Sequence, residues 1–336
     1  MKTTDFAKYL SAFLGTYMPG VRSVSTNTIR SYRDTYRLLL LYCKNHLGIP
    51  VEKVSLATLT DQLVLGFLDW LQEKRNCSAS TRNQRLAAVH AFFRYVQLEE
   101  PLLLASCQRI LAIPFKKHPK PAVRHLTPDA LRLILGQPDP SSILGRRDLT
   151  ILSLLYDTGA RVQELVDLRV RDIRLDEPPV ATLTGKGRKS RHVPLMHNTA
   201  ALLARYMQDH ALGPDSTLDR PLFVNRQFGK MTRAGICYVL RKHSETAREK
   251  SLIVPQALTP HVFRHTKAMH LYQSGVALVY IRDLLGHVDI STTDIYARAD
   301  TEMKRKALEH AYPEMTQASL PDWNQNEGLL SWLGSL

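Results

Sequence analysis

The sequence predicts a mainly helical protein of two domains, the second of which also carries a small β-sheet, so that the fold class is α+β. Its 336 residues exceed the roughly 150 residues of one typical domain, which predicts two hydrophobic cores. Apolar residues recur at helical spacing along most of the chain. Only residues 180–184 and 191–194 read as strands. We expect a helical domain over residues 1–113, a linker over 114–123, an α+β domain over 124–312 and a C-terminal tail over 313–336.

Four helices are expected in the first domain, because apolar side chains recur there every three or four residues. Ser and Thr residues precede the second and fourth helices, where their side chains can cap the free backbone N–H groups. The expected helices run from Asp5 to Tyr17, from about Thr26 to Cys43, from about Thr60 to Lys74, and from near Ser78 or Ser80 to Phe93.

The stretch from Pro114 to Pro121 contains three prolines and three lysines without an apolar period, which predicts an extended linker. Beyond it, the two strands flank a flexible basic turn over residues 185–190. Helices are expected around them, near residues 127–135, 146–158, 161–168, 199–210, 232–249, 261–274, 278–285 and 291–300.

The charge of the chain indicates a polyanionic partner. The formal net charge is +14, and residues 1–120 hold 17 Lys and Arg against 8 Asp and Glu, a net charge of +9. We expect this first part to contact the phosphate backbone of DNA, through exposed basic side chains and helix N-termini. The candidate DNA-binding residues are Arg30, Arg33, Arg37, Arg82, Arg85, Lys116, Lys117 and Lys120.

Several other classes of protein are disfavoured. No apolar run approaches the roughly 20 residues of a membrane-spanning helix, and the N-terminus lacks a signal-peptide pattern. The cysteines, at positions 43, 77, 107 and 237, form no CxxC motif, which disfavours common zinc sites and a disulfide framework. His261 and His265 have zinc-helix spacing, but Val262 stands where a metalloprotease needs Glu. We expect no metal, no cofactor, no membrane association and a cytoplasmic location.

The residues with catalytic potential lie in five short motifs of the second domain. Taken singly, each has an ordinary explanation: a His-x-x-Arg pair is usually a solvated helix face, and an Arg and a Glu three residues apart form a common ion pair. The five motifs are Arg161 and Glu164 in Thr-Gly-Ala-Arg-Val-Gln-Glu-Leu, Lys186 in Gly-Lys-Gly, His261 and Arg264 in His-Val-Phe-Arg-His, His287 in Leu-Leu-Gly-His, and Tyr296 nine residues later.

In this order the motifs resemble those of the tyrosine recombinase (phage integrase) superfamily. The resemblance extends over residues 124–300 by motif, and over residues 5–113 by a helical pattern similar to the SAM-like core-binding domain of the family. It is nearest to the Xer or transposon-integrase branch. It implies a C-shaped clamp on DNA and a site-specific recombinase that cleaves and rejoins strands through a 3′-phosphotyrosine, for integration, excision, transposition or resolution.

The resemblance also implies a role for each motif. Arg161 and Arg264 would hold the nonbridging oxygens of the phosphate, since guanidinium groups stay charged and offer forked donors. Tyr296 would be the nucleophile and His261 the acceptor of its proton. Lys186 would protonate the 5′-oxygen, His287 would donate a hydrogen bond to the phosphate, and Glu164 would orient Arg161 or a neighbouring histidine.

The partner implied by the resemblance is double-stranded DNA with inverted-repeat core sites. On paired sites the protein would form a homotetramer, alone or with a related recombinase, at the nucleoid. The tail would either fold back on its own domain or dock on a neighbouring protomer. Two alternatives remain: a catalytically silent DNA-binding protein on the same fold, and an activity like that of type IB topoisomerases. The complete residue set disfavours the first, and the Leu-Leu-Gly-His motif with a compact helical first domain disfavours the second.

Overall fold

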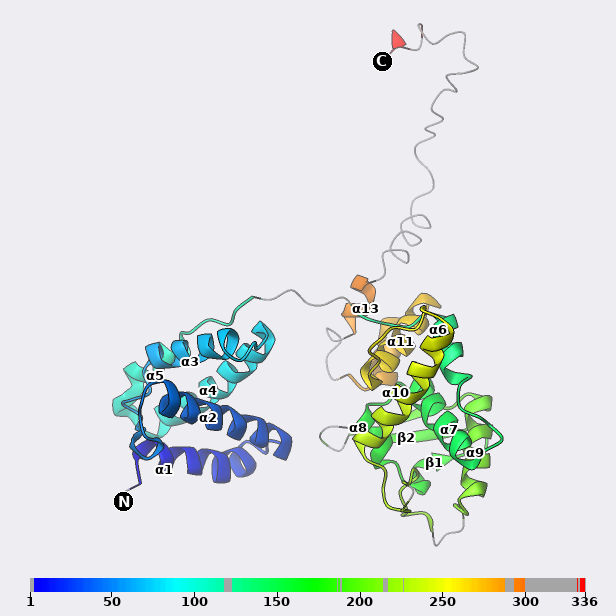
Figure 1. Cartoon of the computed structure of the whole chain (residues 1–336), viewed down its shortest axis with the longest axis horizontal. Coiled ribbons are helices and arrows are strands. Elements are labelled where there is room, and N and C mark those ends of the chain that lie inside the picture. Colours follow the sequence, from blue (N-terminus) through cyan, green and yellow to red (C-terminus); the bar gives the residue numbers. More distant parts are fainter. Residues whose placement is uncertain are drawn as a thin grey trace. The chain divides into compact units, whose positions relative to one another are not determined.

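The computed structural model describes residues 3–117, 123–185, 187, 189–213, 217–225, 227–287, 293–299, 331 and 333–335. The chain divides into two compact units, Met1–Pro121 and Ala122–Leu336, and each is described by itself below (Figure 1). Lys120 and Lys186, the centre of the expected linker and nearly all of the expected tail lie outside the described residues. Within the described residues, no helix is both long and apolar enough to cross a membrane.

The first unit is built from helices, as the sequence predicts. The side chains of Thr4, Ser25, Thr60 and Ser78 each accept a backbone N–H at the start of a helix, which satisfies donors that have no intrahelical partner. The helices are α1 (Asp5–Ala12), continued by a π-helix (Phe13–Val21), α2 (Thr26–His46), α3 (Asp61–Glu73), α4 (Ala79–Glu99) and α5 (Leu104–Leu111), with short 3-10 turns at Val51–Lys53 and Pro101–Leu103.

Helix α5 was not predicted from the sequence. It has eight residues, of which only Cys107 and Ile110 are buried, while Leu104 remains exposed. Such a short segment offers too few apolar repeats to be recognised by periodicity. Packing against α4 therefore stabilises α5, although the spacing of its apolar residues does not predict a helix.

Aromatic rings form the centre of this unit. Phe92 of α4 packs edge-on against Phe6 and Phe13, with ring centroids 5.8 and 5.5 Å apart. Tyr36 of α2 also packs against Phe92, at 5.3 Å, and its buried hydroxyl donates a hydrogen bond to the Ala88 carbonyl at 3.0 Å. The rings thus join α1, α2 and α4 into one core.

The second unit combines helices with a three-stranded antiparallel sheet in the order β1-β2-β3, so the predicted α+β class is confirmed. Strand β1 has only two residues, too few to predict from alternation. The strands are β1 (Ile173–Arg174), β2 (Val180–Thr184) and β3 (Ser190–Pro194); the helices are α6 (Pro128–Leu135), α7 (Ile143–Thr158), α8 (Val162–Asp167), α9 (His197–Asp209), α10 (Arg233–Lys250), α11 (Pro260–Gln273), α12 (Leu278–Leu285) and α13 (Asp294–Ala299), with a 3-10 turn at Val170–Asp172.

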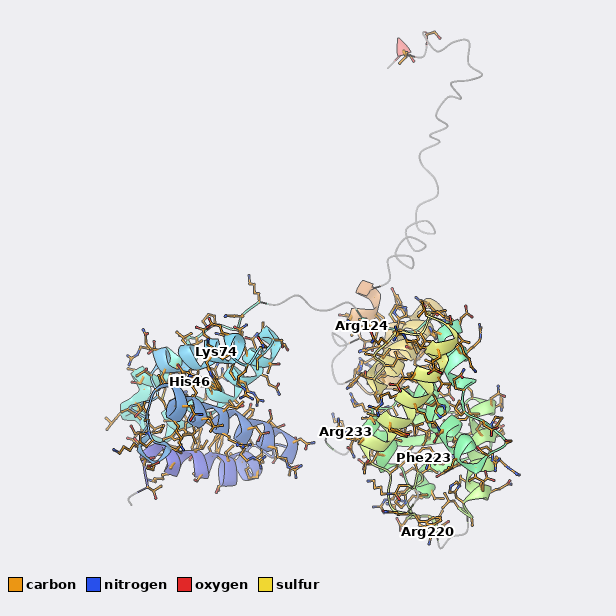
Figure 2. All side chains as sticks on the ribbon, viewed as in Figure 1. His46, Lys74, Arg124, Arg220, Phe223 and Arg233 are labelled. Atoms are coloured by element: carbon orange, nitrogen blue, oxygen red, sulfur yellow. The ribbon has the colours of Figure 1, made fainter. Side chains whose placement is uncertain are left out.

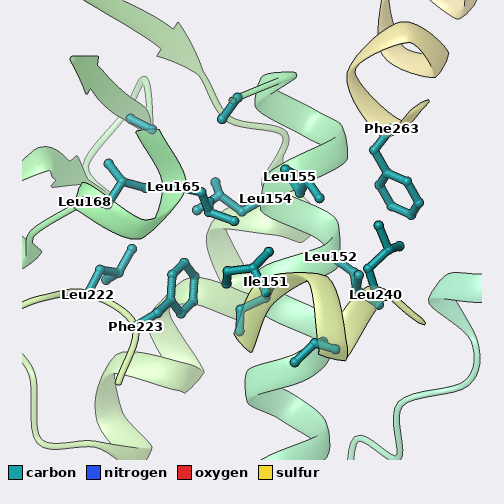
Figure 3. Packing of buried hydrophobic residues seen from close by; sticks show 14 of the residues in the cluster. Ile151, Leu152, Leu154, Leu155, Leu165, Leu168, Leu222, Phe223, Leu240 and Phe263 are labelled. Atoms are coloured by element: carbon teal, nitrogen blue, oxygen red, sulfur yellow. The ribbon is translucent and has the colours of Figure 1, made fainter. Parts of the chain in front are cut away.

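Helix α7 is the centre of this second core. Ile151, Leu152, Leu154 and Leu155 are all fully buried, so the helix is apolar on most of its circumference, as is typical of a buried helix. Figure 3 shows side chains from neighbouring segments, such as Phe263, gathered around it. Because α7 leads directly to α8, and α11 and α12 pack nearby, this core fixes the segments that carry the candidate catalytic residues.

Side-chain hydrogen bonds fix the backbone at Lys116, within the expected linker, and at Leu126, just after it. The amide of Asn83 on α4 donates to the Lys116 carbonyl at 2.8 Å and accepts the Lys116 N–H at 3.0 Å. At the other end, the Leu126 N–H donates to Thr266 Oγ1 at 2.9 Å, and the Leu126 carbonyl lies 2.9 Å from His270 Nε2. The backbone is therefore fixed at Lys116 in the first unit and at Leu126 in the second.

Candidate active site

Arg161 lies at the junction of α7 and α8. Gly159 ends α7 in the left-handed conformation, with φ of +57°, and a Cβ at this position would lie 2.7 Å from the Leu285 side chain. The backbone N–H of Arg161 donates to Glu164 Oε2 at 2.9 Å, and its Nη1 donates to Oε1 at 2.7 Å. The Arg161 side chain is 38% exposed and that of Glu164 only 3%. The buried carboxylate of Glu164 therefore fixes Arg161 by two hydrogen bonds, while the Arg161 side chain remains accessible to solvent.

Arg191, on β3, is a further residue of this cluster and was missed in the sequence. Its Nη2 and Nη1 donate to the two oxygens of Glu164, at 2.7 and 3.1 Å. Burial opposes ionisation of Glu164, but the hydrogen bonds from Arg191 and Arg161 outweigh it and lower the pKa of the carboxyl group. The pairing of the two strands could have indicated this position. Arg191 lies opposite the buried Leu183 of β2, so both side chains are on the same, inward face of the sheet.

Arg264 is a buried residue of α11. It is 3% exposed, and it donates from Nη1 to the Gly159 carbonyl at 2.7 Å and from Nη2 to the Leu285 carbonyl at 2.6 Å. Burial and the positive charge of Arg161 lower its pKa to about 10, so it remains charged at neutral pH. Arg264 thus links the start of the Arg161 motif to the end of α12.

His287 follows α12, which Gly286 ends in the left-handed conformation with φ of +65°. Its Nδ1 lies 2.9 Å from the Thr293 hydroxyl oxygen. Burial, followed by the charges of Arg264 and Arg161, lowers the pKa of His287 to about 4. The ring is therefore neutral at neutral pH.

Tyr296 lies on α13 and is completely buried. Its hydroxyl oxygen lies 3.0 Å from Nδ1 of His265 on α11. Burial raises the pKa of Tyr296 to about 12 despite the charge of Arg264, and burial also lowers the pKa of His265. At neutral pH, therefore, the phenol is protonated and lies within hydrogen-bond distance of a neutral imidazole.

His261 does not occupy the position expected of it beside the Tyr296 hydroxyl; His265, one helical turn further along α11, does. The rings of the two histidines are 6.5 Å apart, and α13 packs against α11 so that Tyr296 faces the second of them. His261 is instead exposed to a cavity of about 720 Å³ that Arg161 also lines. Desolvation and the charges of Arg264, Arg161 and Arg233 lower its pKa.

The α10 helix forms another wall of this cavity. Arg233, at the start of α10 (Figure 2), and Arg241, two turns later, line it together with Tyr238. Neither arginine belongs to a motif that the sequence analysis singled out. Their spacing of eight residues, which places both on one helix face, is the signal that could have identified them.

The candidate DNA-binding arginines of the first unit differ in exposure. Arg30, Arg33 and Arg37 on α2 are exposed, as expected. Arg82 is not: it is only 2% exposed, because it shares the buried stripe of α4 with the apolar residues four, seven and eleven positions later. Arg85 is half-buried, and its Nη1 donates to the Ser31 carbonyl and the Thr35 hydroxyl at 3.0 Å each.

Of the linker lysines, Lys116 and Lys117 are described and exposed. The Lys116 ammonium donates to Gln72 Oε1 at 2.6 Å and lies 3.6 Å from an Asp69 oxygen. Among the described residues, no group of three His, Cys, Asp or Glu side chains could hold a metal ion.

Comparison with protein families and known proteins identifies relatives of both units. Residues 124–303 match the phage integrase family, and residues 10–100 match the phage integrase N-terminal SAM-like domain. The integrase/recombinase homologue y4rC of Sinorhizobium fredii is 34% identical over 336 residues, which cover 100% of this chain and 99% of y4rC. Tyrosine recombinase XerC of Roseiflexus castenholzii is 33% identical, over 92% of this chain and 95% of its own.

Two solved structures share the fold. The Tn1549 transposon integrase superposes with a TM-score of 0.69 at 16% identity, covering 92% of this chain and 100% of that chain. The XerH site-specific recombinase superposes with a TM-score of 0.67 at 21% identity, covering 89% of this chain and 84% of its own.

The chain therefore belongs to the phage integrase family, and the resemblance inferred from its motifs is confirmed. Its enzyme class is that of the site-specific tyrosine recombinases, which are DNA strand transferases.

Proposed function

We propose that this recombinase cleaves and rejoins DNA through a covalent 3′-phosphotyrosine on Tyr296. The observation that carries the proposal is the hydrogen bond between the Tyr296 hydroxyl and His265, in a unit where Arg161 and Arg264 meet at the end of α12. A buried phenol in contact with a neutral imidazole is a nucleophile supplied with a proton acceptor.

His265 would accept the proton of Tyr296 as the phenol oxygen attacks the phosphorus. A phenol with a pKa of about 12 needs such an acceptor at neutral pH, and His265 Nδ1 lies within hydrogen-bond distance. In this assignment His265 replaces His261, which lines the cavity beside Arg161 and would contact the substrate phosphate.

The phosphate would be held by Arg161, Arg264 and His287. The Arg161 side chain is 38% exposed, so its guanidinium can stabilise charge that develops on the nonbridging oxygens. Thr293 can donate its hydroxyl hydrogen to Nδ1 of neutral His287, which leaves Nε2–H free as a donor to the phosphate.

The leaving group is the 5′-oxygen, and we assign its protonation to Lys186 on the basis of the Gly-Lys-Gly motif. The phosphorus gains a bond to the Tyr296 oxygen and loses its bond to the 5′-oxygen. The reverse reaction with a 5′-hydroxyl from another strand rejoins the backbone. The covalent link conserves the energy of the phosphodiester, so the exchange requires no ATP.

The proposed substrate is double-stranded DNA with inverted-repeat core sites. Xer and transposon integrase relatives have been solved with DNA: XerH with its difH substrate and the Tn1549 integrase with circular intermediate DNA. In this chain, residues 1–113 would bind the core site with the exposed arginines of α2, and residues 124–312 would carry the chemistry. Four protomers, alone or with a related recombinase, would act on paired sites at the nucleoid, and the DNA sites would decide between integration, excision, transposition and resolution.

Covalent capture tests this function. Full-length Tyr296→Phe protein selects duplexes from a random-sequence library, and a set of these duplexes, nicked at successive positions, is then offered to the wild type. The wild type should form an adduct that resists SDS, and mass spectrometry after nuclease digestion should locate the phosphodiester on Tyr296. Tyr296→Phe should retain the duplex without forming an adduct, while Tyr280→Phe, at an exposed tyrosine of α12, should behave as the wild type.

Other results identify the alternatives. Retention of DNA without any adduct by the wild type would indicate a silent DNA-binding protein. An adduct that leads to relaxation of supercoiled plasmids, but never to exchange between two sites, would indicate a topoisomerase-like activity.

A further inference from the structure

Three consecutive backbone carbonyls at the end of α12 each accept a hydrogen bond from a different arginine. The Leu284 carbonyl accepts from Arg191 Nε at 2.8 Å, and the next two carbonyls accept from the two arginines already assigned to the phosphate: Leu285 from Arg264 at 2.6 Å and Gly286 from Arg161 at 3.4 Å. The last carbonyls of a helix lack intrahelical partners and carry partial negative charge, so this end of α12 is a suitable seat for cations.

Arg191 differs from the other two arginines in what its fork contacts. Its side chain is 12% exposed, and both terminal nitrogens are directed to the oxygens of Glu164. All three of its side-chain nitrogens thus donate within the protein, two of them to one carboxylate. Arg161 donates one side-chain bond to the same carboxylate and keeps a side chain that is 38% exposed.

We propose that Arg191 is a positioning residue that keeps Arg161 available for the phosphate by occupying the fork of Glu164. An arginine beside an otherwise free carboxylate tends to form two parallel hydrogen bonds. Without Arg191, the Glu164 carboxylate would take a second nitrogen of Arg161 and draw its guanidinium into the protein. With Arg191 in place, Glu164 orients Arg161 without sequestering it. The inference rests on the proposed function, because it assigns Arg161 to the phosphate.

The surrounding glycines are consistent with this arrangement. A Cβ on Gly286 would lie 3.0 Å from both Cδ and Nη1 of Arg191, and a Cβ on Gly185 would lie 3.0 Å from Glu164 Oε1. Gly185 precedes Lys186 in the sequence, and Gly286 precedes His287. The Arg191–Glu164 pair is therefore in close contact with the segments that carry two further candidate catalytic residues, and these segments approach it where a side chain would interfere.

The first experiment compares Arg191→Met and Arg191→Lys with the wild type on the nicked duplex. Arg191→Met should reduce the single-turnover rate of adduct formation by about 30-fold or more, and retention of the duplex should change by less than about 2-fold. Arg191→Lys keeps the charge but cannot supply a fork, so its rate should fall between the two. Arg169→Met removes a surface arginine that pairs with Asp219, and it should leave both quantities unchanged. Equal rates for Arg191→Met and the wild type would overturn the proposal.

The second experiment separates positioning from general structural support. Replacing one nonbridging oxygen of the scissile phosphate by methyl reduces the charge that Arg161 can stabilise, so the difference in rate between wild type and Arg191→Met should shrink. Adding Arg191→Met to Glu164→Gln should lower the rate by less than about 3-fold, since the carboxylate through which Arg191 acts is already altered. An undiminished rate difference on the methylated site, together with additive losses in the double variant, would contradict the assigned role.

A crystal structure of Arg191→Met gives a readout that needs no activity. Two nitrogens of Arg161 should then lie within hydrogen-bond distance of Glu164, and the exposed fraction of Arg161 should fall. An Arg161 conformation unchanged from the wild type would overturn the proposal, even if the wild type forms no adduct with DNA. Absence of an adduct from the wild type would contradict the proposed function alone.

Discussion

The two units of this recombinase bury different kinds of side chain. The first unit packs aromatic rings, such as Phe13 and Phe92, and the polar side chains buried among its described residues include one arginine and no carboxylate. The second unit packs aliphatic side chains and also buries Asp148, Glu164 and Arg264. Buried charges cost free energy unless they are paired. In enzymes they are concentrated at active sites, where the chemistry requires charged groups. The comparison indicates that the core of the first unit is formed by packed rings, whereas the second unit bears the free-energy cost of burying several charged side chains.

Buried charges away from the site support this interpretation, because they join the helices that form the site. Asp148 of α7 contacts His243 of α10 at 3.0 Å. Asp157, also on α7, pairs with Lys267 of α11 at 3.3 Å and accepts the Met196 N–H at 2.8 Å. Through its two buried carboxylates, the central helix is thus connected to α10 and α11, which both line the cavity.

The largest effect is expected from Glu164→Ala, which tests the cost of removing a buried charge from the second unit. The change leaves Arg191 and Arg161 without their shared carboxylate and should destabilise this unit by about 3–5 kcal/mol. Hydrogen exchange followed by mass spectrometry measures the protection of backbone amides separately in each unit. Protection should fall in α8 and β3, while α4 should be unaffected. Equal loss of protection in both units would show that the two are not separate in stability.

Phe92→Ala makes the corresponding test of the aromatic core. Phe92 is fully buried and contacts Phe6, Phe13 and Tyr36, so the cavity left by its ring should destabilise the first unit by about 3–4 kcal/mol. The same exchange measurement should locate the loss in α1, α2 and α4. Leu102→Ala, at a side chain that is 92% exposed, is the matched control and should change protection little. A loss confined to the second unit would contradict the division.

The difference between the units also explains how much the sequence could predict. Helices with caps and apolar stripes follow from local pattern, which is why α2, α3 and α12 begin and end close to the expected residues. The candidate residues Arg161, Arg264 and Tyr296 could be singled out from the sequence, because their motifs resemble those of the family.

Contacts between distant segments are what the sequence could not supply. Arg191 is 27 residues from Glu164, and His265 is 31 residues from Tyr296, so neither pair is marked by spacing. Arg82 was expected to be exposed because of its charge, but its stripe on α4 places it inside. The side of a helix on which a charge lies is decided by packing, and its partner by the tertiary fold.

A smaller effect on the second unit is expected from pH, through His287. The folded-state pKa of His287 is about 4, below the ordinary value of 6.5, so between these values the unfolded chain binds a proton that the folded chain does not. Stability of this unit should therefore fall as the pH decreases from about 6.5 to about 4, by at most about 3 kcal/mol from this group. His287→Gln should lose that part of the pH dependence, whereas a pH slope identical to that of the wild type would rule out His287 as its source.

The smallest effect on stability is expected from removing a surface charge of the first unit. This change tests whether surface charge there affects DNA binding but not the free energy of unfolding. Asp34 pairs with Arg33 at 3.0 Å, but the two side chains are 50% and 65% exposed, so Asp34→Ala should change the unfolding free energy by less than about 0.5 kcal/mol. The same change frees Arg33 and adds one unit of net positive charge to α2. Retention of DNA should therefore strengthen at low salt and fall more steeply as salt is added. Asp219→Ala frees Arg169 and Arg171 in the second unit and is the matched control for charge. If both variants strengthen retention equally, net charge alone acts; a gain specific to Asp34→Ala places the DNA contact on α2.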